Sequence, residues 1–221
     1  EVIDSTLAAG NTCLAAMTLH VDLVGPQGAL PADVARLIRC VEKTAALKGR
    51  FGANPKPVLV WHPSGYPTGE SINDQAVVNG LRQALGQVCQ VAEKLGVWVA
   101  VEITRAGSIG SAESFLRVKD QVPSPALKVC MDAANFCPDR TPLERAVRML
   151  GADTVIGHGK DSRFAENGEV AHYGPITSGK LDYPTYLRAL KHYTPATYFV
   201  LEYYGNREEL LKARDVVQAG L

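Results

Sequence analysis

Residues Val97–Thr104 read VWVAVEIT, and this stretch decides the fold. Nearly all of its residues are apolar and most are β-branched or aromatic, which predicts a strand buried on both faces, as in a parallel sheet. Glu102 is the exception, near the C-terminal end. Because an ionised carboxylate is almost never buried alone, Glu102 needs an Arg or Lys, a hydrogen-bond network or a metal ion beside it.

Five more stretches have the character of buried strands and alternate with helical segments. The predicted strands are Cys13–Val24, Pro57–His62, Leu127–Asp132, Thr154–His158 and Tyr198–Tyr203. The predicted helices cover about 31–48, 71–95, 112–121, 141–150 and 184–192, with one more after Asn206 and the end of another in 1–10. Successive strand–helix units predict a parallel sheet in an α/β protein.

Local signals mark where several helices begin. Pro31 and Pro142 are each predicted at a first helical position, where a missing backbone N–H costs nothing. The capping pairs are Ser71 with Asp74, Thr141 with Glu144, and Asn206 with Glu209. The polar, Gly-rich residues 159–181 are predicted to form a long loop, and loops of this length are usually functional.

Polar residues lie at the C-terminal ends of five successive strands. They are His62, Glu102, Asp132, His158 and Glu202. In a doubly wound sheet only the strands beside the switch point should carry functional residues, whereas all strand ends of a barrel converge on one mouth. No GxGxxG follows a predicted strand, which further disfavours a dinucleotide-binding sheet. We therefore expect a (β/α)8 TIM barrel.

A single polar residue at a strand end is more often structural than functional, but five such residues on successive strands indicate a metal site. Glu102, Asp132 and Glu202 would repel one another at a common mouth unless a cation lay between them. The close cations in the sequence are Lys160 and Arg163. Together with one His, the three acids form an oxygen and nitrogen set without thiolates. This set suits Mn²⁺ first, with Mg²⁺, Co²⁺, Fe²⁺ or Zn²⁺ as alternatives.

Composition limits the class of protein. The 221 residues are 46% hydrophobic, enough for a large core, and we expect residues 1–221 to form a single domain. Lys plus Arg and Asp plus Glu both number 23, which argues against nucleic acid or an anionic membrane as partner. The sequence shows no apolar run of membrane-spanning length and no signal-peptide pattern. Five cysteines without a CxxC pattern indicate reduced thiols in a cytoplasmic protein.

The sequence resembles the xylose isomerase-like barrel superfamily of sugar and sugar-phosphate isomerases and epimerases. The stretches that carry the resemblance are VLVWHPSG, GVWVAVEIT, LKVCMDAANF, VIGHGKDSR, GPITSGKLDYPTYLRAL and YFVLEYYG, over about residues 58–205. The resemblance implies that Glu102, Asp132, His158 and Glu202 bind a divalent metal ion at the mouth of a TIM barrel.

Two features depart from the family pattern. A full barrel has eight strands and six are predicted here, so the resemblance places the missing first one or two βα units before residue 1. Many ketose epimerases of the family have a substrate-binding His where this sequence has Asn135. The related apurinic endonucleases use extra His and Asp ligands, and Asn135 stands where one of those ligands would be.

The resemblance and the chemistry together predict a metal-dependent isomerase or epimerase that moves a proton through an enediolate, with Glu102 and Glu202 as base and acid. The expected substrate is a small sugar or sugar phosphate, and the sequence leaves a homo-oligomer open. The expected substrate-binding residues are His62, Asn135, Lys160 and Arg163. Three alternatives remain: a metal-dependent sugar or inosose dehydratase, a non-catalytic sugar-binding barrel and an apurinic endonuclease.

Overall fold

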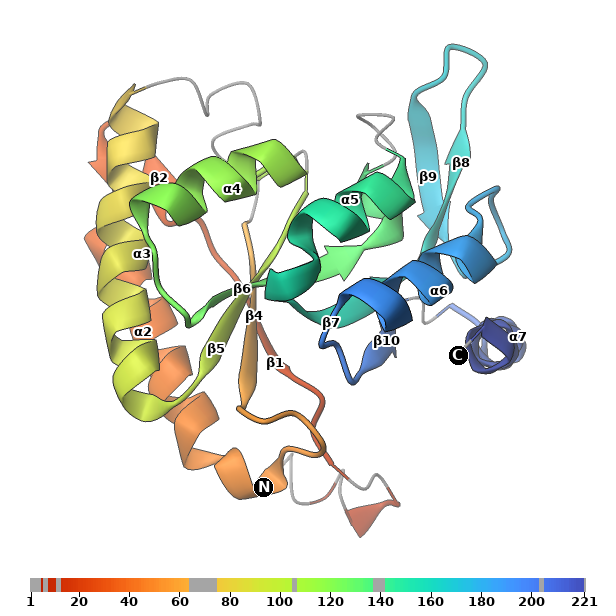
Figure 1. Cartoon of the computed structure of the whole chain (residues 1–221), viewed down its shortest axis with the longest axis horizontal. Helices are drawn as coiled ribbons and strands as arrows, with labels where there is room; N and C mark the ends of the chain where they lie inside the picture. The colour runs from red at the N-terminus through yellow and green to blue at the C-terminus, as the bar shows by residue number, and fades with distance from the viewer. Residues whose placement is uncertain are drawn as a thin grey trace.

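The main sheet is built from parallel strands in chain order. The computed structural model describes residues 5, 8–10, 13–63, 75–104, 107–136, 142–202 and 205–220 (Figure 1). The strands are β1 (Met17–His20), β4 (Val58–His62), β5 (Trp98–Glu102), β6 (Leu127–Asp132), β7 (Thr154–Gly159) and β10 (Phe199–Leu201). All neighbouring pairs are parallel. These strands coincide with the six predicted stretches, which confirms the parallel α/β sheet.

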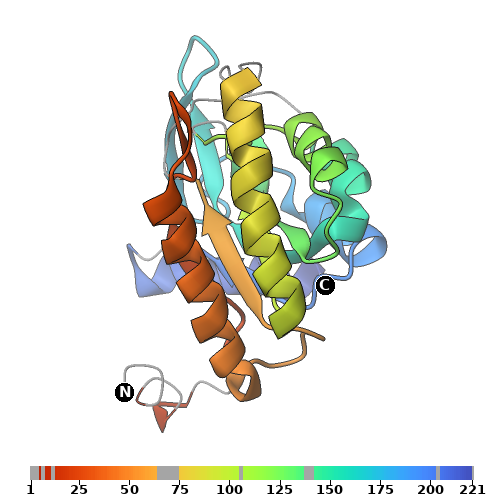
Figure 2. The ribbon, with the colours of Figure 1, turned by 90° about the vertical axis from the view of Figure 1, so that its left-hand side faces the viewer.

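Helices follow the strands along the chain. They are α2 (Pro31–Ala46), α3 (Gln75–Leu95), α4 (Ala112–Gln121), α5 (Leu143–Leu150), α6 (Tyr183–Tyr193) and α7 (Arg207–Gly220), with 3-10 turns η1 (Lys48–Arg50), η3 (Ala133–Phe136) and η4 (Gly151–Asp153). Figure 2 shows α2 and α3 standing side by side in front of β4. None of the helices in the described ranges is long and apolar enough to cross a lipid bilayer.

The strands are buried on both faces, as their continuous apolar sequences predict. Trp61 and Val99 belong to the large core cluster that includes the helices. Val60 and Ala100, one residue along each strand, belong to a second cluster. Because side chains alternate along a strand, the two clusters lie on opposite faces of the sheet. The second cluster receives Ala15 and Ala16 from before β1 and Val200 from β10, so the sheet curls to bring its two ends together.

The observed helix starts can be compared with the prolines and capping residues predicted from the sequence. Pro31 is the first residue of α2, as predicted. The last helix is capped by Asn206, whose Oδ1 accepts the Glu208 N–H over 2.8 Å. Pro142 was predicted inside its helix, but it is the N-cap residue and α5 begins at Leu143. The capping residues Ser71, Asp74 and Thr141 lie outside the described residues.

Two predicted boundaries need correction. The observed strand β1 is shorter than the predicted strand 13–24. A hairpin of β2 (Val24–Gly25) and β3 (Gly28–Ala29) follows β1 and includes the last residue of the predicted strand. Gly28 has a φ of 107°, which favours glycine in this tight turn. The predicted loop 159–181 contains an antiparallel hairpin of β8 (Asp161–Phe164) and β9 (Val170–Gly174).

A tyrosine joins the two ends of the curled sheet. Tyr198 directly precedes β10, and its hydroxyl lies 3.3 Å from Cys13 Sγ and accepts the Ala53 N–H over 2.7 Å. Gly52 leaves room for this contact, because a Cβ at Gly52 would lie 1.7 Å from Tyr198 Oη. In the described part of the chain, β1 and β10 end the six-stranded sheet. Two further strands, which a full eight-stranded barrel would need, are not among the described residues.

Candidate metal centre

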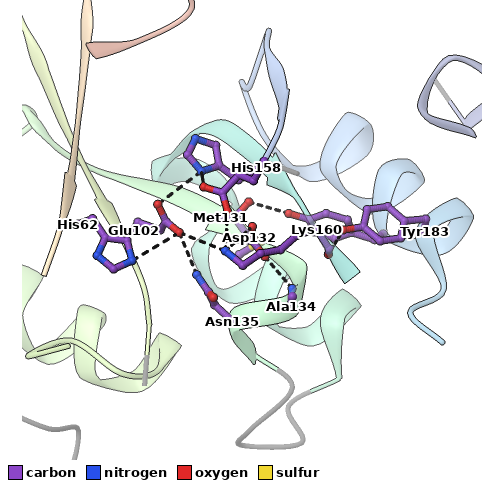
Figure 3. Close-up of polar contacts among 11 residues, drawn as sticks. His62, Glu102, Met131, Asp132, Ala134, Asn135, His158, Lys160 and Tyr183 are labelled. Atoms are coloured by element: carbon purple, nitrogen blue, oxygen red, sulfur yellow. Dashed lines mark hydrogen bonds and ion pairs between the residues drawn. The ribbon is translucent and has the colours of Figure 1, made fainter. Parts of the chain in front are cut away.

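Four polar side chains meet at the C-terminal edge of the sheet (Figure 3). Glu102 and Asp132 are the last residues of β5 and β6, His158 lies in β7, and Glu202 directly follows β10. Asp132 is paired with His158 across the β6–β7 ladder, and Val200 with His158 across β7–β10. One ligand atom from each of the four side chains lies within 4.8 Å of the others. The predicted convergence of these strand ends is confirmed.

The contacts inside this cluster are short. His158 Nδ1 lies 2.7 Å from Glu202 Oε1 and 3.4 Å from Glu102 Oε2. Lys160 Nζ lies 2.5 Å from Glu202 Oε2, 3.2 Å from Asp132 Oδ2 and 3.7 Å from Glu102 Oε1. The ammonium of Lys160 therefore faces all three acids from just beyond the end of β7.

Burial and charge act in opposite directions on these acids. Burial raises the pKa of Asp132 to about 6, and the nearby Glu202 and Glu102 carboxylates add to this effect while Lys160 opposes it. Burial would also raise the pKa of Glu102 and Glu202. At these two residues the hydrogen bonds and charge of His158, together with the charge of Lys160, outweigh burial, so the pKa values of Glu102 and Glu202 are lowered. Glu102 and Glu202 are thus held as carboxylates.

The two basic groups respond to the same carboxylates. Burial alone would lower the pKa of His158, but its neighbours Cys130, Glu102 and Glu202 raise it well above the usual value. Lys160 behaves likewise: burial lowers its pKa, and the charges of Asp132 and Glu202 raise it above its usual range. Without a metal ion, His158 carries a proton that a cation would displace.

The donor set fits a divalent cation. Three carboxylates face the ammonium of Lys160 and the protonated His158, so the cluster keeps a net negative charge when no ion is bound. Asp132 Oδ1 accepts the Ala134 N–H over 2.8 Å, while the fully buried Oδ2 has no hydrogen-bond partner among the described residues and only the ion-pair contact to Lys160. A buried carboxylate oxygen is costly unless a cation meets it, and Asp132 Oδ2 shares the Lys160 ammonium with Glu102 and Glu202. The Glu, Asp, His and Glu donors match the oxygen and nitrogen ligands that Mn²⁺ or Mg²⁺ accept.

A second set could also hold a cation, and sequence analysis missed its thiol. Glu102, Cys130 and His158 each offer an atom within 4.8 Å of the others. Cys130 lies two residues before Asp132 in β6, so period-two alternation places both side chains on one face. Burial raises the pKa of the Cys130 thiol to about 11. The four-residue set supplies three carboxylates where this set supplies one, and ions such as Mn²⁺ or Mg²⁺ prefer oxygen to sulfur, which favours the four-residue set.

The predicted substrate-binding residues differ in where they lie. Asn135, in η3, donates from Nδ2 to Glu102 Oε1 over 3.0 Å. His62 Nε2 lies 3.9 Å from the same oxygen, and its ring stacks on His20 with centroids 4.4 Å apart. Burial lowers the pKa of His62, so a neutral ring lies beside the cluster.

Arg163 is the exception among them. It lies on the β8–β9 hairpin, and its Nε donates to the Ser178 carbonyl over 2.6 Å. The structure therefore brings Lys160, Asn135 and His62 to the three acids and His158, while Arg163 is bound to a neighbouring turn.

Sequence analysis missed several residues that hold the site in place. The Tyr183 hydroxyl donates to the Lys160 carbonyl (Figure 3), and the Tyr186 hydroxyl donates to the Met131 carbonyl over 2.8 Å. Asp161 accepts the N–H groups of Ser162, Thr177 and Leu181. Nothing in the sequence separates these tyrosines from ordinary core aromatics of a helix. Asp161, Tyr183 and Tyr186 all lie within stretches that carry the resemblance.

A family model described as "Xylose isomerase-like TIM barrel" matches residues 5–219. Among solved structures, a D-tagatose 3-epimerase-like protein has 16% identity and a TM-score of 0.74, covering 99% of this chain and 81% of that one. The probable 3-DHS dehydratase AsbF from Bacillus anthracis has 16% identity and a TM-score of 0.72, with coverages of 92% and 75%. A xylose isomerase-like TIM barrel protein from Mycobacterium smegmatis in complex with magnesium has 15% identity and a TM-score of 0.68, with coverages of 99% and 77%. No curated protein matches the sequence.

Proposed function

The chain belongs to the xylose isomerase-like TIM barrel family, and from this premise we propose that it is a divalent-metal-dependent isomerase or epimerase of small sugars. The observation that carries the proposal is the convergence of Glu102, Asp132, His158 and Glu202, whose ligand atoms lie within 4.8 Å of one another. Buried acids from several strand ends are the usual source of catalytic groups in a barrel of this kind.

These four residues would hold the ion, and Mn²⁺ is the one we propose from their oxygen and nitrogen donors. When bound, a divalent ion supplies polarisation of a ketose carbonyl and its neighbouring hydroxyl, which makes the proton on the adjacent carbon more acidic. Asp132, with its second oxygen unsatisfied, and His158, through Nδ1, are proposed to act as ligands only.

Glu102 and Glu202 are the proposed base and acid. One carboxylate takes the proton from carbon to give an enediolate. The other is ionised in the resting site, takes up a proton when substrate binds and returns it to carbon. Return to the same carbon on the opposite face inverts the centre, and return to the neighbouring carbon gives isomerisation. Asn135 holds Glu102 in place and Lys160 holds Glu202. His62 and Lys160 are proposed to contact substrate oxygens.

Solvent deuterium exchange tests this assignment. Glu102→Gln and Glu202→Gln should each slow deuterium incorporation into a ketose by about 10²- to 10⁴-fold, the usual contribution of general acid–base catalysis. Metal content is measured for each variant, because both residues are also proposed ligands. Glu144→Gln, an exposed acid paired with Arg148 on α5, is the control and should exchange at the wild-type rate. Unchanged exchange in both site variants would remove the acid and base roles.

Elimination of water is a second candidate reaction, and Lys160 is the observation that favours it. Its ammonium lies within 3.7 Å of the three acids, where it could donate to a departing hydroxyl while a carboxylate takes the carbon-bound proton. Product analysis separates the two reactions. A dehydratase releases an unsaturated or deoxy ketone, whereas an epimerase or isomerase conserves the formula of the sugar.

A further inference from the structure

Three aromatic rings pack together on the face of the sheet that the helices cover. Tyr183 and Tyr186 lie three positions apart on α6, and Phe199 is the first residue of β10. Their ring centroids lie 5.9–6.4 Å apart in edge-to-face arrangements. Both tyrosines belong to the large core cluster, and Phe199 packs against it. Together these three residues form the aromatic cluster.

The proposed metal ligands lie on the opposite face of the same strands. In β6, Met131 belongs to the core cluster on the helix side, whereas Cys130 belongs to the cluster on the other face of the sheet. Because side chains alternate along a strand, Asp132 shares the face of Cys130. The aromatic cluster therefore lies behind the metal centre, with the sheet between them.

Strand β7 leaves space for the aromatic cluster on both sides of His158. The two residues next to His158 are Gly157 and Gly159. A Cβ at Gly157 would lie 2.7 Å from Phe199 Cδ2, and a Cβ at Gly159 would meet the same ring. Both glycines face away from the metal centre, since they alternate with His158 along the strand. The Phe199 ring therefore packs directly on the backbone that carries His158.

The Tyr186 hydroxyl reaches the backbone next to Asp132. It donates to the Met131 carbonyl over 2.8 Å, and the Tyr186 side chain is fully buried. On the other side of Asp132, the Ala134 N–H donates to the Asp132 Oδ1 over 2.8 Å. The first bond fixes the backbone before Asp132, and the second fixes its carboxylate.

The aromatic cluster thus contacts three of the strands that carry proposed ligands. The Tyr186 hydroxyl bonds to β6, the Phe199 ring packs on β7, and Phe199 itself lies in β10, three residues before Glu202. A functional site needs its side chains held within about 0.5 Å of the productive geometry, which packing and hydrogen bonds behind the ligands provide. The aromatic cluster is placed to give this support.

We propose that Tyr186 is a positioning residue of the metal centre, which holds Asp132 where the other three ligands can share an ion with it. Tyr186 touches neither the ion nor the substrate, and it acts through the Met131 carbonyl. The rings of Phe199 and Tyr183 keep the Tyr186 ring in place. This inference rests on the proposed function, because it takes the four residues as ligands of one ion.

Tyr186→Phe separates positioning from packing, because it removes the hydroxyl and keeps the ring. Calorimetric titration should show Mn²⁺ binding about three- to tenfold weaker than in the wild type, equivalent to the loss of one hydrogen bond. The electron paramagnetic resonance spectrum of the Mn²⁺-saturated variant should also differ from that of the wild type, because the arrangement of the ligands changes. Tyr193→Phe is the control. It makes the same change at the C-terminal end of α6, where the ring lies under the Arg148 guanidinium, and should match the wild type in both measurements.

A role in packing alone predicts a different result. Tyr186→Phe would then lower Tm while Mn²⁺ affinity and the spectrum at saturation equal those of the wild type, and this outcome would overturn the inference. Should Tyr186→Phe fail to fold, Phe199→Leu is measured in its place. It keeps the Tyr186 hydroxyl and removes the supporting ring, so it should also weaken Mn²⁺ binding, and equal affinity would again overturn the inference.

Deuterium exchange keeps this test apart from the proposed reaction. Mn²⁺ binding that depends on Tyr186, without exchange into a ketose in the wild type, would support the inference and contradict the proposed function. Exchange in the wild type with an unchanged Mn²⁺ site in Tyr186→Phe would overturn the inference and leave the reaction standing. A wild type that binds no Mn²⁺ would overturn both.

Discussion

Asn135 orients an acid of the cluster without belonging to the proposed ligand set. Its side-chain amide donates to Glu102 Oε1, and the residue itself is buried on η3. An N–H donor stabilises the charged form of a carboxylate. This amide therefore holds one oxygen of Glu102 and leaves the second oxygen, Oε2, 3.4 Å from His158 Nδ1.

Replacing Asn135 with Ala should weaken Mn²⁺ binding by about 10- to 100-fold, the usual cost of losing a hydrogen bond that orients a metal ligand. Calorimetric titration of the metal-free protein measures this change. Asn54→Ala is the control, because the Asn54 amide donates to the Ala15 carbonyl away from the cluster. Equal affinities of Asn135→Ala and the wild type would contradict the orienting role.

The Cys130 thiol gives a prediction with a defined pH range. Its pKa, raised by burial to about 11, means that the neutral form persists through neutral and mildly alkaline pH. Cys130→Ala should therefore keep Mn²⁺ affinity within about twofold of wild type at neutral pH. Cobalt-loaded wild-type protein should lack a sulfur-to-cobalt charge-transfer band. Such a band would show that the thiolate ligates the ion, and the four-residue set would then be wrong.

The acids of the cluster could be predicted from the sequence because each ends an apolar run of strand character. Parallel strands place such residues at one edge whatever the details of packing. The bonds from Asn135 to Glu102 and from Tyr183 to Lys160 depend on how a turn and a helix pack against the sheet. No local pattern contains that information, so these residues were not assigned their orienting roles.

At the scale of elements, α3 packs closely against the β2–β3 hairpin through a glycine. A Cβ at Gly80 would lie 2.8 Å from the Ala29 nitrogen and 2.9 Å from the Gly28 carbonyl carbon. These neighbours are backbone atoms, which cannot rotate away. Gly86, six residues further along α3, is exposed and has open space around its Cβ position.

These two glycines form a matched pair for mutagenesis. Gly80→Ala should destabilise the protein by about 1–3 kcal/mol, because overpacking outweighs the better helix propensity of Ala. Gly86→Ala should stabilise it by about 0.5–1 kcal/mol through propensity alone. Urea unfolding of both variants measures the difference. A stabilised Gly80→Ala would show that the hairpin does not pack on α3 as described.

The β8–β9 hairpin could not be predicted from its sequence. Residues 164–173 are mostly exposed, and their apolar and polar residues do not alternate, so they lack the pattern that identifies strands with one buried face. The six strands of the sheet could be predicted because burial on both faces requires continuous apolar runs. The hairpin is stabilised by its pairing and by contacts of Asp161, which are visible only after folding.

For the whole molecule, a bound ion would join four strands of the sheet, β5, β6, β7 and β10. A ligand that binds only the folded state stabilises it by RT ln(1 + [L]/Kd). At about a hundredfold excess over Kd, Mn²⁺ should raise Tm by about 5–10 °C for a protein of this size. Differential scanning calorimetry with and without the ion measures the shift.

Two Asp variants control for non-specific effects of the ion. Asp132→Asn should lose the shift, because Asp132 is a proposed ligand. Asp153→Asn should keep it, since Asp153 pairs with Lys119 and Lys128 outside the cluster. Asp153→Asn should have a lower Tm than the wild type without metal, because losing the carboxylate leaves the ammonium groups of Lys119 and Lys128 facing each other. A shift of equal size in Asp132→Asn would argue against the proposed site.

The bond between Tyr198 and Cys13 spans 185 positions of the chain, and this separation matters during synthesis. A ribosome adding about 5–20 residues per second needs on the order of ten seconds to pass from one partner to the other. Throughout that interval the contact between the two ends of the sheet is missing, and the edge of β1 that no strand of the described chain covers can pair with other nascent chains. Overproduction in cells should therefore favour insoluble material when translation is slowed, and co-expressed holdase chaperones should recover it.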